Sequence, residues 1–183
     1  MRRETHGRWP LLAAAGALPV SALAIRRPAL RPWAALLLHQ TEEWVWPGGF
    51  LPWINREVLG SREDEFPLDR RLGFAINVVL GWGSSLAAAA GPRGAAPAAL
   101  LYSSNLGNVA LHVSWAARNR RYDPGVVTAV ATLAPTGVAG LRSLSSDERV
   151  PRSAVWSGIA AGCAASVLLP QLLRRRVRGK ARR

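Results

Sequence analysis

The stretch 72–90, LGFAINVVLGWGSSLAAAA, decides the fold class, and it directly follows the basic pair Arg70 and Arg71. None of its 19 residues carries a charged side chain. As an α-helix rising about 1.5 Å per residue, this stretch spans most of the roughly 30 Å hydrocarbon core of a bilayer. It therefore predicts a membrane-spanning helix with cationic residues at one membrane surface.

Five other apolar blocks are of similar length, and basic residues flank most of them. These blocks are residues 9–25, 29–46, 95–117, 125–141 and 153–173. We therefore predict an all-α fold, a polytopic transmembrane bundle of five or six helices in one membrane domain. The number stays open because block 29–46 is interrupted by polar residues and can either cross the membrane or re-enter on the same side.

The first block, 9–25, also has two interpretations. Three arginines precede it, and Ala-Leu-Ala at 22–24 is similar to a signal-peptide cleavage site. Arg26 and Arg27 follow at once, and basic residues in that position oppose translocation. An uncleaved first span is therefore favoured, with a cleaved signal peptide as the alternative.

The distribution of the basic residues predicts the orientation of the chain in the membrane and does not indicate a nucleic-acid partner. The chain has 24 basic and 11 acidic residues, a net charge of +13. The basic residues cluster in connectors and in the tail 174–183, and no nucleic-acid-binding module is recognisable. Whether the chain makes five spans or six, 17 basic residues lie on one side of the membrane and seven on the other. The positive-inside rule thus predicts a multi-pass protein of the inner (plasma) membrane with a cytoplasmic C-terminus. The tail is expected to contact anionic lipid head groups; the oligomeric state is not indicated.

Ionisable residues inside two apolar blocks mark the candidate site. His39, Glu42 and Glu43 lie in block 29–46, and His112 lies in the fourth block. Each charged group at the centre of a span costs about 2.5–3.5 kcal/mol, so such groups face the bundle interior and have partners. On a helix, His39 shares one face with residues three and four positions later. We therefore expect these four residues to form one polar or metal-binding site.

Four further polar residues are expected around this site: Asn77, Asn105, Asn108 and Thr132. The two asparagines of the fourth block form a polar stripe with the histidine of that block. Asn77, Thr132 and both histidines each lie six or seven residues from the cytoplasmic end of a block. At 1.5 Å per residue, all of them are roughly 9–11 Å deep. Four helices thus contribute to one polar layer near the cytoplasmic side.

The chemistry of this layer stays open between two classes. Two imidazoles with one or two carboxylates suit Zn, Fe or Mn, and an open coordination position activates water. That interpretation gives an intramembrane enzyme acting on a lipid-like or apolar substrate. The alternative is a metal-free polar network that is structural, relays protons or binds a polar-headed lipid. The spacing matches no familiar catalytic geometry, which favours a non-enzymatic small-ligand, proton or scaffold role. The single cysteine, Cys163, excludes a disulfide framework and a Cys-based zinc site.

Two other patterns predict local structure only. Asp123 and Pro124 predict a turn and a helix start, with Asp123 as the N-cap and Pro124 as the first helical residue. Thr128, Thr132 and Thr136 are four apart, which predicts hydroxyl bonds to the carbonyls of their own helix.

The motif residues also resemble a known family. His-Gln-Thr-Glu-Glu-Trp at 39–44, with Pro-Gly-Gly-Phe at 47–50 and Trp-Ile-Asn at 53–55, resembles the HXXEE domain family of small bacterial membrane proteins. Residues 105–112 and Arg-Tyr-Asp-Pro-Gly at 121–125, followed by Thr128, are similar to the second signature of that family. The resemblance covers roughly 33–141 and leaves block 9–25 outside the shared core. It implies that the motif residues form the site, and it implies no particular reaction.

Overall fold

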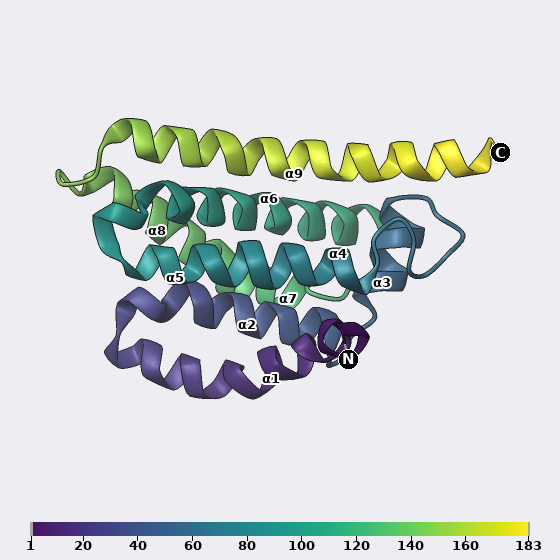
Figure 1. The fold of residues 1–183 in the computed structure, drawn as a ribbon, viewed down its shortest axis with the longest axis horizontal. Coiled ribbons are helices and arrows are strands. Elements are labelled where there is room, and N and C mark those ends of the chain that lie inside the picture. The colour runs from purple at the N-terminus through teal and green to yellow at the C-terminus, as the bar shows by residue number, and fades with distance from the viewer. Residues whose placement is uncertain (1, 183) are drawn as a thin grey trace.

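The computed structural model describes residues 2–182, with side chains from residue 8 onward, and these residues form helices and no strand. The chain makes six antiparallel helical passes (Figure 1). The first two are α1 (Arg2–Arg26), then η1 (Pro28–Leu30) with α2 (Arg31–Trp44). The third is α4 (Arg70–Phe74), η3 (Ala75–Trp82) and α5 (Gly83–Ala89). After η4 (Gly91–Gly94), the last three are α6 (Ala95–Asn119), α7 (Val126–Thr128) with η5 (Ala129–Leu133) and α8 (Ala134–Ser146), and α9 (Arg152–Ala181). The predicted all-α bundle is confirmed.

Four of the six passes are long and apolar enough to cross a membrane. They are Arg8–Arg26, Arg70–Ala89, Val126–Ser146 and Arg152–Ala181. Only 11–28 % of the most apolar window in each is buried inside the protein. Their outer faces are thus apolar and uncovered, which is the surface that a bilayer covers. The remaining two passes, α2 and α6, carry the polar residues.

The helix α2 lies inside the bundle, and nine of its 14 residues are buried. Leu37 packs against Trp9, Ala13 and Ala17 of α1. Since α1 covers this apolar face, the face that carries His39 turns toward α6 and α7. The position of α1 therefore orients the candidate site.

Small residues bring α9 close to α6. A Cβ atom added to Gly158 would lie 2.3 Å from the Ala96 carbonyl oxygen, and one added to Gly162 would lie 2.0 Å from Ser103 Oγ. Only glycine allows the two backbones to approach so closely. The side of α6 opposite the site is thereby fixed by α9.

The long connector 45–69 lies at the same end of the bundle as the 120–125 connector and the C-terminal part of α9 (Figure 1). It contains α3 (Phe50–Pro52) and η2 (Trp53–Val58), a π-helix. Leu173 of α9 is buried in a cluster with residues of η2, and Arg174 donates to the Val58 carbonyl at 3.0 Å. The last helix therefore holds the connector in place above the site.

Candidate metal centre

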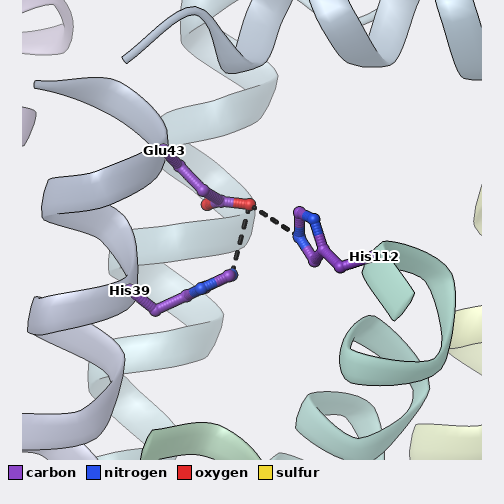
Figure 2. A group of neighbouring side chains, drawn as sticks. All are labelled: His39, Glu43 and His112. Atoms are coloured by element: carbon purple, nitrogen blue, oxygen red, sulfur yellow. Dashed lines mark ion pairs between the residues drawn. The ribbon is translucent and has the colours of Figure 1, made fainter. Parts of the chain in front are cut away.

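Three ionisable side chains converge between α2 and α6. Figure 2 shows the Glu43 carboxylate between two imidazole rings, 3.2 Å from His39 Nε2 and 3.4 Å from His112 Nε2. The exposed fractions of the three residues are 1 % for His39, 3 % for Glu43 and 0 % for His112. One donor atom from each lies within 4.8 Å of the others. The four-residue spacing puts the first two on one face of α2, and α6, which runs parallel to α2, supplies the third.

The orientation of His112 is set by two neighbours outside its own helix. Asp123 Oδ1 lies 2.5 Å from His112 Nδ1, and the Asp123 side chain is fully buried. The indole of Trp53 stacks on the imidazole at a centroid distance of 5.0 Å and an angle of 9°. With the Asp123 carboxylate on Nδ1, the other ring nitrogen, Nε2, points toward Glu43.

His39 is held in a similar way from both sides of its ring. Its Nδ1 lies 3.1 Å from Thr128 Oγ1, and its Nε2 lies 2.9 Å from Asn108 Nδ2. The Thr128 hydroxyl donates to Glu42, so it accepts the proton on His39 Nδ1. His39 Nε2 thus lies between Asn108 and the Glu43 carboxylate.

The backbone of Gly125 closes the centre. Its φ angle is +115°, a left-handed conformation that favours glycine. A Cβ atom here would lie 2.8 Å from His112 Cε1 and 2.9 Å from both His39 Cε1 and Glu43 Cγ. The connector thus lies directly on all three converging side chains, and only glycine fits.

Comparison with known proteins agrees with this geometry. The model of a family described as a protein of unknown function with HXXEE motif matches residues 32–139. The chain belongs to this HXXEE family. No curated protein and no solved structure matches the chain. The matched range contains α2, α6, both site connectors and all the residues of the centre, and it leaves α1 and α9 outside.

The two glutamates of the HXXEE motif have different environments. Glu43 lies in the centre, whereas Glu42 accepts the backbone N–H groups of Thr128 at 2.7 Å and Val127 at 3.2 Å. It also accepts the Thr128 hydroxyl and, at 2.9 Å, the Tyr122 hydroxyl. Consecutive helical residues point about 100° apart, so they reach different partners. Glu42 therefore caps the N-terminus of α7 from another helix, where free N–H groups favour a carboxylate.

Tyr122 keeps its proton in this arrangement. Burial, together with the hydrogen bond to Glu42, raises the pKa of the Tyr122 hydroxyl. The hydroxyl therefore acts as a donor, which is consistent with an ionised Glu42 that has four donors around it.

The turn and helix start predicted at 122–125 of this HXXEE protein are confirmed, but the predicted cap assignments are wrong. The N-cap of α7 is Gly125 and the helix begins at Val126, so neither Asp123 nor Pro124 has its predicted role. The Asp123 carboxylate contacts His112 instead, because Glu42 already satisfies the start of the helix. Thr132 and Thr136 bond the carbonyls of their own helix at 2.6 Å, as expected, whereas Thr128 turns to the motif residues.

The surrounding polar residues are distributed over several places. Asn108 contacts the centre through His39, but Asn77 accepts a hydrogen bond from Gln40 at 3.0 Å. Trp82 Nε1 donates to Gln40 at 2.9 Å, which completes a separate polar cluster between α2 and η3. In the part of the chain that the structure describes, Thr132 and Asn105 form no side-chain hydrogen bond with the centre. Sequence reasoning instead missed the contributions of Asp123, Thr128 and Gly125, although the second family signature contained them.

Proposed function

We propose that this HXXEE protein is an integral membrane protein that binds one divalent transition-metal ion, with zinc as the best match, through His39, Glu43 and His112. The observation that carries the proposal is the convergence of two imidazole nitrogens on one buried carboxylate oxygen. Three electron-rich atoms without a positive charge between them repel one another, and burial strengthens the repulsion. A cation at their centre removes it.

Hydrogen-bond partners support this assignment. The Nδ1 atom of each ring faces an oxygen, Asp123 Oδ1 for His112 and Thr128 Oγ1 for His39. A carboxylate or hydroxyl on the far nitrogen is the usual arrangement around metal-bound histidines, because it fixes the tautomer and the ring direction. The Nε2 atom of His112 forms no hydrogen bond within the described part of the chain. It is therefore free to bind an ion.

The two distances to the Glu43 oxygen agree with tetrahedral coordination, and all three donor atoms lie within 4.8 Å of one another. Ligand atoms about 2.0–2.1 Å from a tetrahedral ion are separated by about 3.3 Å. The oxygen of Glu43 lies 3.2 Å from one ring nitrogen and 3.4 Å from the other. Three protein ligands leave a fourth position, as in catalytic zinc sites, where the ion supplies Lewis acidity and an activated water. This supports an intramembrane enzyme for lipid-like substrates as the finer part of the proposal.

One contact favours the second candidate, a metal-free network. Asn108 Nδ2 donates to His39 Nε2 at 2.9 Å and so uses the lone pair that an ion needs. In that state a proton, rather than a metal ion, lies between Glu43 and the imidazoles. The network would then join α2 to α6 in a structural or proton-conducting role.

Metal content after purification in detergent decides between the two candidates. We expect about one ion per wild-type chain, lost in Glu43→Gln and His112→Ala. The matched control is Glu42→Gln, which alters the adjacent carboxylate and should retain the ion. Size-exclusion chromatography of each variant checks that the fold persists. If the wild-type protein carries no metal, and Zn, Mn and Fe do not raise its thermal midpoint, the metal proposal is wrong and the network candidate stands.

The orientation in the membrane and the lipid partners of the tail belong to the proposal as well. The basic C-terminal turns of α9 lie at the end of the bundle that also holds the connectors 45–69 and 120–125 (Figure 1). This end carries the excess of basic residues, so the positive-inside rule supports a cytoplasmic location in the inner membrane. Lys180 pairs with Glu63 at 2.5 Å, Arg174 donates to the Val58 carbonyl, and Arg176 lies over the Phe66 ring. Arg175, Arg178 and Arg182 remain for anionic head groups.

A further inference from the structure

A surface hollow of about 380 Å³ lies beside the metal centre, at the same end of the bundle. Residues from the two connectors and from α6 line it, among them the Pro-Gly-Gly turn at 47–49, Trp53, Glu57, Trp115, Arg121 and Tyr122. Its volume falls in the range of small-ligand sites. The motif residues that the metal centre does not use, the Pro-Gly-Gly turn and Tyr122, belong to this hollow.

The hollow is separated from the centre by one side chain. Trp53 lines the hollow and stacks on His112 at 5.0 Å, and only 6 % of Trp53 is exposed. Tyr122, on the opposite connector, reaches Glu42 through its hydroxyl while its ring lines the hollow. A molecule bound in the hollow therefore lies next to the residues that orient the centre.

Two opposite charges line the hollow without neutralising each other. Arg121 and Glu57 are both exposed, and neither forms an ion pair or a side-chain hydrogen bond with any residue that the structure describes. Arg56, also in the lining, is paired with Asp64. The unpaired cation and anion complement a zwitterion that carries a phosphate and an ammonium group.

The aromatic residues of the hollow, and the level at which the hollow lies in the membrane, also fit a zwitterionic head group. Trp53 and Trp115 meet edge to face at 5.6 Å in the lining, and an aromatic wall attracts an ammonium group. The hollow lies where α2 ends at Trp44 and α6 ends at Asn119. Helix ends and exposed aromatic rings, such as Tyr122 at 50 % exposure, mark the level of lipid head groups. A phospholipid of the bilayer therefore has its head group at the right depth.

We infer that this hollow binds the head group of a zwitterionic aminophospholipid, with Arg121 on the phosphate and Glu57 with Trp115 on the ammonium group. The binding itself needs no metal ion. Combined with the metal centre, it makes an aminophospholipid the substrate class of this protein, and that step alone rests on the proposed function.

Native mass spectrometry of the full-length protein in detergent tests the inference, with phosphatidylethanolamine and phosphatidylglycerol as probes. Because the basic tail is expected to bind the anionic phosphatidylglycerol, occupancy of the hollow is measured as binding of phosphatidylethanolamine, which we expect for the wild-type protein. Arg121→Gln is expected to weaken that binding about tenfold, the effect of losing one charge-assisted contact. Arg118→Gln, in the same basic run but outside the hollow, is the matched control and should bind as wild type. Glu57→Gln should weaken the binding of phosphatidylethanolamine and leave the binding of phosphatidylglycerol unchanged.

Two results would overturn the inference. One is wild-type binding by both Arg121→Gln and Glu57→Gln. The other is equal binding of inorganic phosphate or glycerophosphoethanolamine, which would show a site for a soluble solute rather than a bilayer lipid. Both substituted residues are exposed, so an unchanged thermal midpoint excludes misfolding. Glu43→Gln is expected to keep its lipid binding, so failure of the metal centre and failure of the head-group site give different results.

Discussion

Replacing Gly125 by alanine tests the packing of the centre most directly. The new Cβ atom would lie 2.8–2.9 Å from carbon atoms of His112, His39 and Glu43. Ordinary carbon contacts begin near 3.5 Å, so each side chain has to withdraw by about 0.6–0.7 Å. The three atoms belong to different residues, and no single rotamer change relieves all three contacts. Such overpacking costs about 1–3 kcal/mol.

The backbone adds a second cost, which a matched variant isolates. At a φ of +115°, alanine loses about 1–2 kcal/mol relative to glycine. Gly60 has a φ of +75°, and a Cβ atom there would meet nothing within 4 Å. Gly60→Ala therefore carries the backbone cost alone, about 1–2 kcal/mol, against about 2–5 kcal/mol for Gly125→Ala.

Thermal unfolding in detergent, followed by circular dichroism, measures the difference. In a chain of this length each kcal/mol lowers the midpoint by about 2–4 °C. Gly125→Ala should also weaken zinc binding, because the displaced donor atoms no longer share one ion, whereas Gly60→Ala should not. Equal midpoints for the two variants, with unchanged zinc affinity, would refute the close contact between the connector and the centre.

Three other outcomes are expected. Asp123→Asn removes the negative charge beside the α6 histidine and should lower zinc affinity about 10–100-fold in a chelator competition. The control Asp147→Asn, at a half-buried carboxylate that pairs with Arg149, should leave zinc affinity unchanged. Thr128→Val removes a hydroxyl shared by two motif residues and should lower the free energy of unfolding by about 1–3 kcal/mol. Chemical denaturation checks this against Thr136→Val, whose hydroxyl contacts only its own helix. A reporter fused to the C-terminus should be active in the cytoplasm, and activity only outside would reverse the orientation.

Helix positions were largely predictable. Block 95–117 corresponds to α6 (Ala95–Asn119), and block 153–173 lies within α9 (Arg152–Ala181). The extra turns of α9 consist mainly of arginine, which favours helix, and Lys180 anchors them to the connector through Glu63. Apolar block length finds the part of a helix that lies in the membrane, and it misses polar turns that continue beyond the surface.

The site was predictable in part. Helical spacing paired His39 with Glu43, and equal depth added His112, and these three do lie together. Equal depth also predicted that Asn77 belongs to the site, but Asn77 accepts a hydrogen bond from Gln40 on another face of α2. Depth fixes the position along a helix axis but says nothing about rotation around it, and rotation decides which polar residues meet.

The sequence by itself determined the number of passes to within one, their apolar faces and the residues too polar to face lipid. These properties follow from burial of apolar area and from backbone hydrogen bonding, which depend on composition along a single segment. Only the tertiary structure decided which glutamate enters the centre and which one caps α7. Tertiary structure also decided that Asp123, which the sequence predicts as a helix cap, is the partner of His112. Both outcomes depend on the 120–125 connector lying across the end of α2, about 80 residues away in the chain, and contacts between such distant segments are set by how the whole bundle packs.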